Sequence, residues 1–196
     1  MNQIKYVVAF FLCLNIFLPG CIHSSDDDVV IHEAPGEDEP YDDIYEESTS
    51  QFDVIRDFET RYKIHSTMLS RRFLAAFSNR YNKLFNEPQP VLEEASQKTS
   101  FFVSLYTANR ELLDLSDDQT WNIQLKRSGV LSKPSLVKRI HQKERWTPFF
   151  KSINPWSREY ILVFDEPPAS GKGLVENVNT QLIISNADGR VTMSWD

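Results

Sequence analysis

The acidic residues of this chain are concentrated in one segment, which limits where a folded core can form. Eleven carboxylates and no lysine or arginine lie between Ile22 and Ser50. The segment also has few apolar side chains, so burial there offers little to offset the entropy lost on ordering. We therefore predict an acidic, disordered linker over residues 21–50.

The linker admits a second interpretation. Tyr41, Ile44 and Tyr45 lie among its carboxylates. Acidic segments with aromatic residues can become ordered when they contact a basic partner. The sequence leaves open whether this segment is a spacer or a binding arm.

The remaining residues, 51–196, have the length and charge balance of a single globular domain. They carry 20 Lys and Arg against 17 Asp and Glu, so the net charge of −7 for the whole chain comes from the linker. A domain of about 146 residues buries roughly two-thirds of the surface that its unfolded chain exposes. The weakly basic charge also disfavours a nucleic-acid partner, which needs a strongly basic face.

The N-terminal part of this domain has the periodicity of a helix. Apolar residues recur mostly three or four positions apart from Val54 to Phe85, which predicts one broad apolar face on a long helix. Asn86 and Pro88 end the pattern. A break near His65 would divide the segment into two helices.

Strand patterns follow the predicted helix. Ser132-Lys133-Pro134 interrupts them and predicts a second, short helix that ends near Glu144. The last two strands flank Asn186-Ala187-Asp188-Gly189, in which Asp-Gly is a strong hairpin signal. The order predicts an α+β fold in which an antiparallel sheet of about five strands packs against the long N-terminal helix. The predicted strands cover residues 101–107, 121–126, 160–164, 181–185 and 190–195.

The N-terminal residues have the pattern of an export signal. Lys5 precedes an apolar run over residues 6–17, which is shorter than the roughly 20 residues of a membrane span. Leu18-Pro19-Gly20-Cys21 follows the run. This arrangement resembles the signal peptide and lipobox of bacterial lipoproteins. The resemblance implies removal of residues 1–20 and lipid attachment at Cys21, where fatty acids such as palmitate would be incorporated.

The same resemblance implies a location on a membrane of the cell envelope. Ile22 after the cysteine, rather than aspartate, is similar to lipoproteins sorted to the outer membrane in hosts with two membranes. Cys13 would leave with the signal, so the mature chain would hold a single cysteine and no internal disulfide. The sequence thus predicts three parts, which are a signal peptide over 1–20, the lipidated cysteine with its linker over 21–50, and a single domain over 51–196.

Aromatic and basic residues gather in one segment of the predicted domain. Flat apolar area combined with cations is typical of surfaces that bind a protein, a glycan or lipid headgroups. We expect this segment to form the binding face, although its aromatic residues would also suit the core beneath a loop. The candidate residues are Arg145, Trp146, Phe149, Trp156 and Arg158.

Signals for catalysis or metal binding are sparse. Asp114, Asp117 and Asp118 precede Trp121 and would supply the paired carboxylates of an envelope glycan or peptidoglycan hydrolase. A solvated loop explains these carboxylates as well. The two histidines of the domain lie far apart without metal-ligand spacing, so we predict no metal and no cofactor.

Together these features favour a membrane-anchored envelope lipoprotein that is not an enzyme. Its partners would be the membrane, through the lipid at Cys21, and an envelope protein or glycan bound by the periplasmic or surface-exposed domain. The hydrolase is the alternative function.

Overall fold

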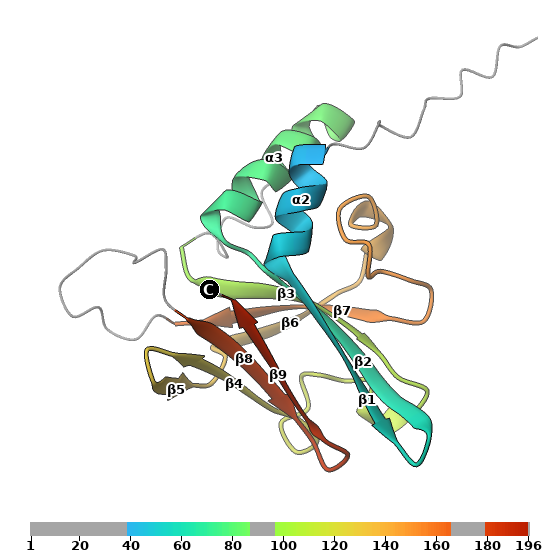
Figure 1. Cartoon of the computed structure of the whole chain (residues 1–196). Coiled ribbons are helices and arrows are strands. Elements are labelled where there is room, and N and C mark those ends of the chain that lie inside the picture. The colour runs from blue at the N-terminus through green and yellow to red at the C-terminus, as the bar shows by residue number, and fades with distance from the viewer. Residues whose placement is uncertain (1–38, 87–96, 166–178, 196) are drawn as a thin grey trace, which may run out of the picture. The chain divides into compact units, whose positions relative to one another are not determined.

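The computed structural model describes residues 39–86, 97–165 and 179–195 (Figure 1). The predicted signal peptide, the lipidation site Cys21 and the linker up to residue 38 lie outside the described residues. The helices within the described ranges are too short or too polar to span a bilayer. In chain order the elements are α2 (Glu39–Ser48), β1 (Thr49–Arg56), β2 (Glu59–Met68), α3 (Arg71–Phe85), β3 (Thr99–Tyr106), η1 (Arg110–Leu112), β4 (Asn122–Arg127), β5 (Val130–Ser132), β6 (Leu136–Ile140), η2 (Lys143–Arg145), β7 (Arg158–Phe164), β8 (Thr180–Ser185) and β9 (Arg190–Trp195).

The strands form two antiparallel sheets that enclose the first core of the domain. One sheet has the order β1-β2-β3-β7-β6 and the other β5-β4-β8-β9. Successive side chains of a strand point to opposite faces of its sheet. One set from β2, β3 and β7, including Tyr62, Val103 and Leu162, packs against Leu182 and Met193 of the smaller sheet. We call this side of the five-stranded sheet its inner face.

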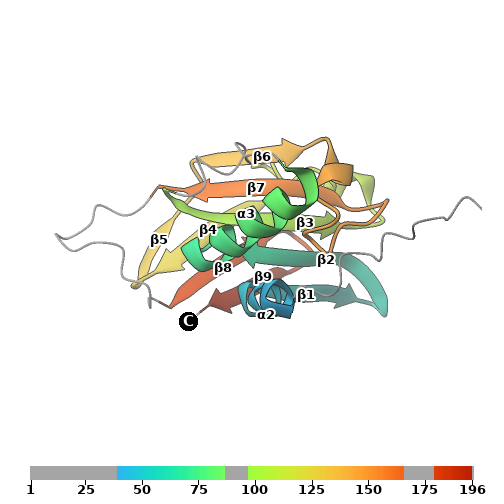
Figure 2. The same cartoon turned by 90° about the horizontal axis from the view of Figure 1, so that it is seen from above.

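Helices α2 and α3 lie over the outer face of the five-stranded sheet (Figures 1 and 2). Tyr41 of α2 and Phe73 and Phe77 of α3 pack there with Phe102 of β3 and Ile161 of β7. This group is the second core of the domain. Strands β3 and β7 are therefore buried on both faces, which explains their nearly continuous apolar sequences.

Strand β9, the last of the described strands, contacts the end of α2 and strand β1 near the start of the domain. The indole Nε1 of Trp195, at the end of β9, donates a hydrogen bond to the carbonyl oxygen of Ser48 at 2.8 Å. Strands β1 and β9 are also in contact, although they belong to different sheets. Residues that are far apart in the sequence thus complete the first core.

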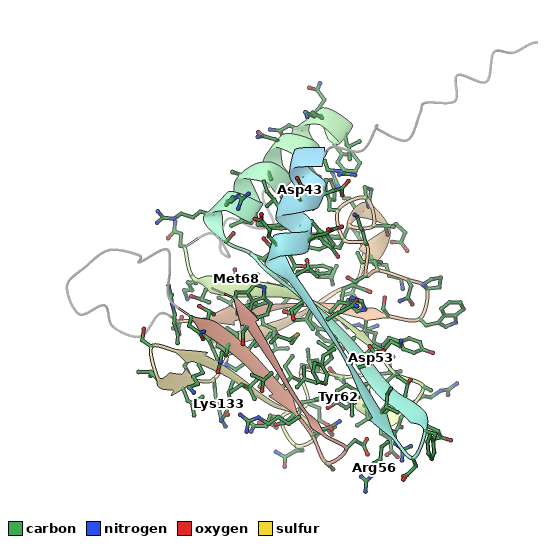
Figure 3. All side chains as sticks on the ribbon, in the orientation of Figure 1. Asp43, Asp53, Arg56, Tyr62, Met68 and Lys133 are labelled. Carbon is green, nitrogen blue, oxygen red and sulfur yellow. The ribbon has the colours of Figure 1, made fainter. Side chains whose placement is uncertain are left out.

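The predicted long helix over 54–85 is wrong in its first half, because those residues form most of the β1–β2 hairpin. Asp57 and Phe58 make the turn with φ angles of 53° and 64°, without the glycine that usually marks such a turn. Figure 3 shows Arg56 close to this turn. The second half is helical as α3, which ends as predicted. Asn86 caps it in the left-handed conformation, with a φ angle of 51°.

The predicted short helix from Ser132 to Glu144 is also wrong. Ser132 ends β5, Leu136–Ile140 form the edge strand β6, and the short 3-10 helix η2 begins at Lys143. Leu136 and Ile140 pack against the second core, whereas Val137 packs against the first. Apolar residues at positions 136, 137 and 140 have the spacing of one face of a helix. In β6 the same spacing arises because the strand contacts a core on each of its two faces.

The predicted disordered linker is wrong for residues 39–50, which form α2 and the start of β1. Tyr41 and Tyr45 are one helical turn apart, so both face the second core and are buried. The exposed side of α2 is acidic and meets basic residues of the same domain. The ion pairs join Asp42 to Arg80 and Lys151, Glu46 to Lys151, and Glu47 to Arg72. The acidic aromatic segment therefore docks on its own domain.

The other strand predictions are confirmed by β3, β4, β7, β8 and β9. The predicted hairpin joins β8 to β9, and β4 alternates between exposed and buried residues as expected. The α+β class is confirmed, with antiparallel sheets. The described residues hold nine strands in two sheets, rather than about five strands in one sheet.

Candidate binding site

Two of the five predicted binding residues belong to the second core. Trp146 and Phe149 are only 7% and 1% exposed. Their ring centroids lie 6.0 and 4.6 Å from that of Phe77 on α3. Burial removes Trp146 and Phe149 from the candidate face and agrees with the other interpretation of this segment, an aromatic core beneath a loop.

Trp156 is the exposed aromatic residue of the segment, with 73% of its surface accessible to solvent. It borders a pocket of about 290 Å³ on the outer face of the five-stranded sheet. We call this the Trp156 pocket. Its lining residues are Lys63, His65, Ser104, Tyr106, Ser152, Asn154 and Trp156.

Two neighbouring strands supply the floor of the Trp156 pocket. Lys63 of β2 pairs in register with Tyr106 of β3, and His65 pairs with Ser104. Strand alternation directs these four side chains to the outer face. The next pair on this face, Thr67 and Phe102, brings Phe102 into the second core beneath the helices. The pocket therefore occupies the end of the sheet that the second core does not cover.

A hydrogen-bonded loop holds Trp156 at the edge of the pocket. The side-chain oxygen of Asn154 accepts hydrogen bonds from the backbone N–H groups of Trp156 and Ser157, both at 3.0 Å. The ammonium group of Lys143 donates to the carbonyl oxygens of Asn154 and Pro155 at 2.7 and 3.1 Å. These contacts fix the backbone on both sides of Trp156 while its ring remains exposed.

A buried carboxylate supports the same loop. Glu159 of β7 is buried and pairs in register with Ser104 on the floor of the pocket. Its Oε1 accepts a hydrogen bond from the hydroxyl group of Ser157. The hydroxyl group of Ser104 donates to the carbonyl oxygen of Ser152 at 3.2 Å. The sheet thus holds both ends of the 152–157 loop.

The residues that line the Trp156 pocket are mostly of polar types, but they contribute little unbalanced charge. The ammonium group of Lys63 lies 2.8 Å from the carboxylate of Asp53 on β1. Burial is the main effect on the pKa of His65 and brings it below its ordinary value of 6.5. The carboxylate of Asp53 raises this pKa and the ammonium group of Lys63 lowers it, so the net shift is downward. His65 is therefore neutral at pH 7, and its ring offers one donor and one acceptor.

The two predicted arginines lie away from the lining of the pocket. The guanidinium carbon of Arg145 is 5.7 and 5.4 Å from the ring centroids of Tyr81 and Phe85. Arg158 begins β7, and alternation along the strand directs it to the inner face. Its Nη1 lies 3.5 Å from the carbonyl oxygen of Leu113. Of the five candidates, only Trp156 lines the pocket.

The carboxylates near Trp121 hold the turns of their own loop. Asp114 accepts hydrogen bonds from the hydroxyl group and the backbone N–H group of Ser116, which lower the pKa of Asp114. The hydroxyl group of Thr120 is the main cause of the lowered pKa of Asp117. A general acid in glycoside hydrolysis needs a raised pKa. Asp114 and Asp117 are therefore poorly suited to that role.

Metal-ligating side chains do not cluster within the described residues. No group of three or more His, Cys, Asp or Glu is placed there to hold an ion. Asp118 accepts a hydrogen bond from the Gln119 side chain at 3.0 Å, as part of the same loop.

Sequence reasoning missed the floor of the pocket because it assigned β2 to a helix. Lys63 and His65 alternate with Tyr62 and Ile64, which are fully buried in the first core. This alternation is the signal of a strand with one polar face. It would have placed Lys63 and His65 together on a surface.

The chain matches no known family model and no curated protein. The function of the pocket is therefore inferred from its own geometry.

Proposed function

We propose that this protein is a membrane-tethered binding protein of the cell envelope and that the Trp156 pocket is its ligand-binding surface. The observation that carries the proposal is the exposure of Trp156 beside a pocket that has hydrogen-bonding side chains in its lining. A large aromatic ring in solvent loses little conformational entropy on binding, and tryptophan is frequent among residues that dominate binding energy. The fixed loop lowers the entropic cost further.

Binding without catalysis agrees best with the chemistry of the described residues. The lining of the pocket includes one histidine and no carboxylate. The nearby carboxylate of Glu159 is buried and bound to Ser157, so it does not face a ligand. Asp114 and Asp117 are held ionised by their hydrogen bonds, which weakens the alternative of a glycan hydrolase.

The membrane part of the proposal is supported by the resemblance of the N-terminal sequence to lipoprotein signals. A lipid at Cys21 would keep the domain at the envelope membrane. A chain tethered beside its partner binds at a high effective concentration, so a small binding surface suffices.

Crosslinking in cells tests the binding surface. We expect full-length tagged protein to give a discrete crosslinked partner that is lost in Trp156→Ala. Phe58→Ala is the matched control, because Phe58 is a fully exposed aromatic residue on the β1–β2 turn. Retention of the partner by Trp156→Ala, or equal loss in both variants, would contradict the proposal.

Metabolic labelling tests the anchor separately. Labelled palmitate should enter the wild-type chain and be absent from Cys21→Ala. Equal incorporation in both chains would contradict lipid attachment at Cys21.

A further inference from the structure

We infer that the Trp156 pocket binds a neutral saccharide, with the ring of Trp156 as the stacking surface. This inference rests on the proposed function and specifies its ligand. Sugar rings have an apolar C–H face and a rim of hydroxyl groups. An exposed aromatic ring stacks on the C–H face, and hydrogen-bonding side chains beside it bind the hydroxyl groups.

The exposed ring and the size of the pocket fit this class of ligand. Trp156 presents a flat apolar surface on a backbone that Asn154 and Lys143 hold in place. The pocket volume of about 290 Å³ is near the lower end of the roughly 300–1,000 Å³ found for small-molecule sites. It therefore suits one or two sugar units better than a folded protein surface.

Free hydrogen-bonding groups line the pocket. Among the described residues, the ring of His65 and the hydroxyl groups of Tyr106 and Ser152 have no hydrogen-bond partner. They include both donors and acceptors, as a sugar hydroxyl group requires. They also come from β2, β3 and the loop, so they surround the space beside Trp156.

The charge of the pocket favours a neutral ligand. Lys63 is paired with Asp53 at 2.8 Å, and burial keeps the imidazole of His65 uncharged at pH 7. A strongly anionic ligand would find no free cation among the lining residues, and a cationic ligand would find no carboxylate in the lining. A polar, uncharged ligand is therefore favoured.

Titration with neutral oligosaccharides tests the inference directly. The probes are tetramers of β-1,4-linked N-acetylglucosamine, β-1,4-linked glucose and α-1,4-linked glucose, added to the full chain purified in detergent. The other three tryptophans, at positions 121, 146 and 195, are buried, so a change in fluorescence on binding reports mainly on Trp156. We expect saturable binding of at least one probe, confirmed by saturation-transfer NMR of the sugar protons.

Variants identify the stacking ring. Trp156→Ala should weaken saccharide binding by about tenfold or more because it removes the stacking surface, and His65→Ala by a smaller factor because it removes one hydrogen-bonding group. Phe58→Ala should bind like the wild type. The dissociation constant should also change by less than about twofold between roughly 50 and 500 mM salt, since screening has little effect on an uncharged ligand.

Two results would overturn the inference, namely no saturable binding of any probe, or binding that Trp156→Ala leaves unchanged. Such a failure differs from a failure of the proposed function. If no sugar binds but the crosslinked partner still disappears in Trp156→Ala, the pocket binds another class of ligand. If Trp156→Ala changes neither result, both proposals fail.

Discussion

His65 of β2 and Ser104 of β3 stand directly opposite each other on the part of the five-stranded sheet that the second core leaves uncovered. The hydroxyl group of Ser104 is bound to the carbonyl oxygen of Ser152 in the loop above it. The imidazole of His65 has no such partner among the described residues and faces the pocket. One member of the pair thus fastens the loop, whereas the other is available to a ligand.

Acidification should destabilise the domain through His65. Because burial lowers the pKa of His65 in the folded chain, the unfolded chain binds the proton more readily. Stability is therefore retained above the ordinary pKa of 6.5 and lost as the pH falls through the lower folded-state value. Urea unfolding at about pH 7.5 and 5.5 measures this loss. His65→Gln should remove most of the difference, and an unchanged difference in this variant would contradict the assignment.

Trp146 and Trp156 should respond in opposite ways to truncation. Trp146→Ala removes a buried ring from the second core and should lower the free energy of unfolding by about 3–5 kcal/mol. Trp156→Ala removes an exposed ring, so its effect should stay within about 0.5 kcal/mol. Chemical denaturation of both variants measures the contrast. A large loss of unfolding free energy in Trp156→Ala would show that the ring supports the fold. Weaker binding by this variant would then no longer be evidence for a contact between Trp156 and the ligand.

Ser157→Ala should loosen the loop that carries Trp156. The substitution leaves the buried carboxylate of Glu159 without the hydroxyl group that binds it, at a cost of about 1–3 kcal/mol. Hydrogen exchange of backbone amides over residues 152–157 should accelerate more than exchange in β3. Ser78→Ala, an exposed serine on α3, is the matched control and should change neither measurement. Equal protection of the loop in both variants would contradict a supporting role for Ser157.

Tyr41→Ala should show that α2 is part of the domain. Tyr41 is buried, and its hydroxyl group donates to the carbonyl oxygen of Phe149 at 2.8 Å. Loss of the ring should lower the free energy of unfolding by about 3 kcal/mol or more. Asp43→Ala on the same helix is the control, because Asp43 is exposed (Figure 3). If both variants unfold at the same denaturant concentration, α2 does not dock in solution.

The sequence predicts best the strands whose patterns are local. β4 alternates, and the β8–β9 hairpin contains Asp188-Gly189, so both are recognised without tertiary information. The β1–β2 hairpin is not, because Asp57 and Phe58 adopt positive φ angles without glycine. α2 is missed because its charge suggests disorder, whereas the basic residues that neutralise it lie at distant positions.

The candidate site shows the same limit. Trp156 is recognisable from its neighbourhood of aromatic and basic residues. However, local sequence cannot separate it from Trp146, because the burial of Trp146 depends on its contact with Phe77 of α3, which is distant in the sequence. The floor of the pocket depends on the register of β2 with β3, a long-range pairing that composition does not reveal.

The hydrogen bond between Trp195 and Ser48 has a consequence for how the protein is made. The smaller sheet that covers the inner face includes β8 and β9, which come last in the described chain. A ribosome releases residues 180–195 after the strands of the larger sheet. Until then, β2, β3 and β7 display an apolar surface that favours aggregation. Newly synthesised chains should therefore depend on a chaperone that binds exposed apolar strands until β9 arrives.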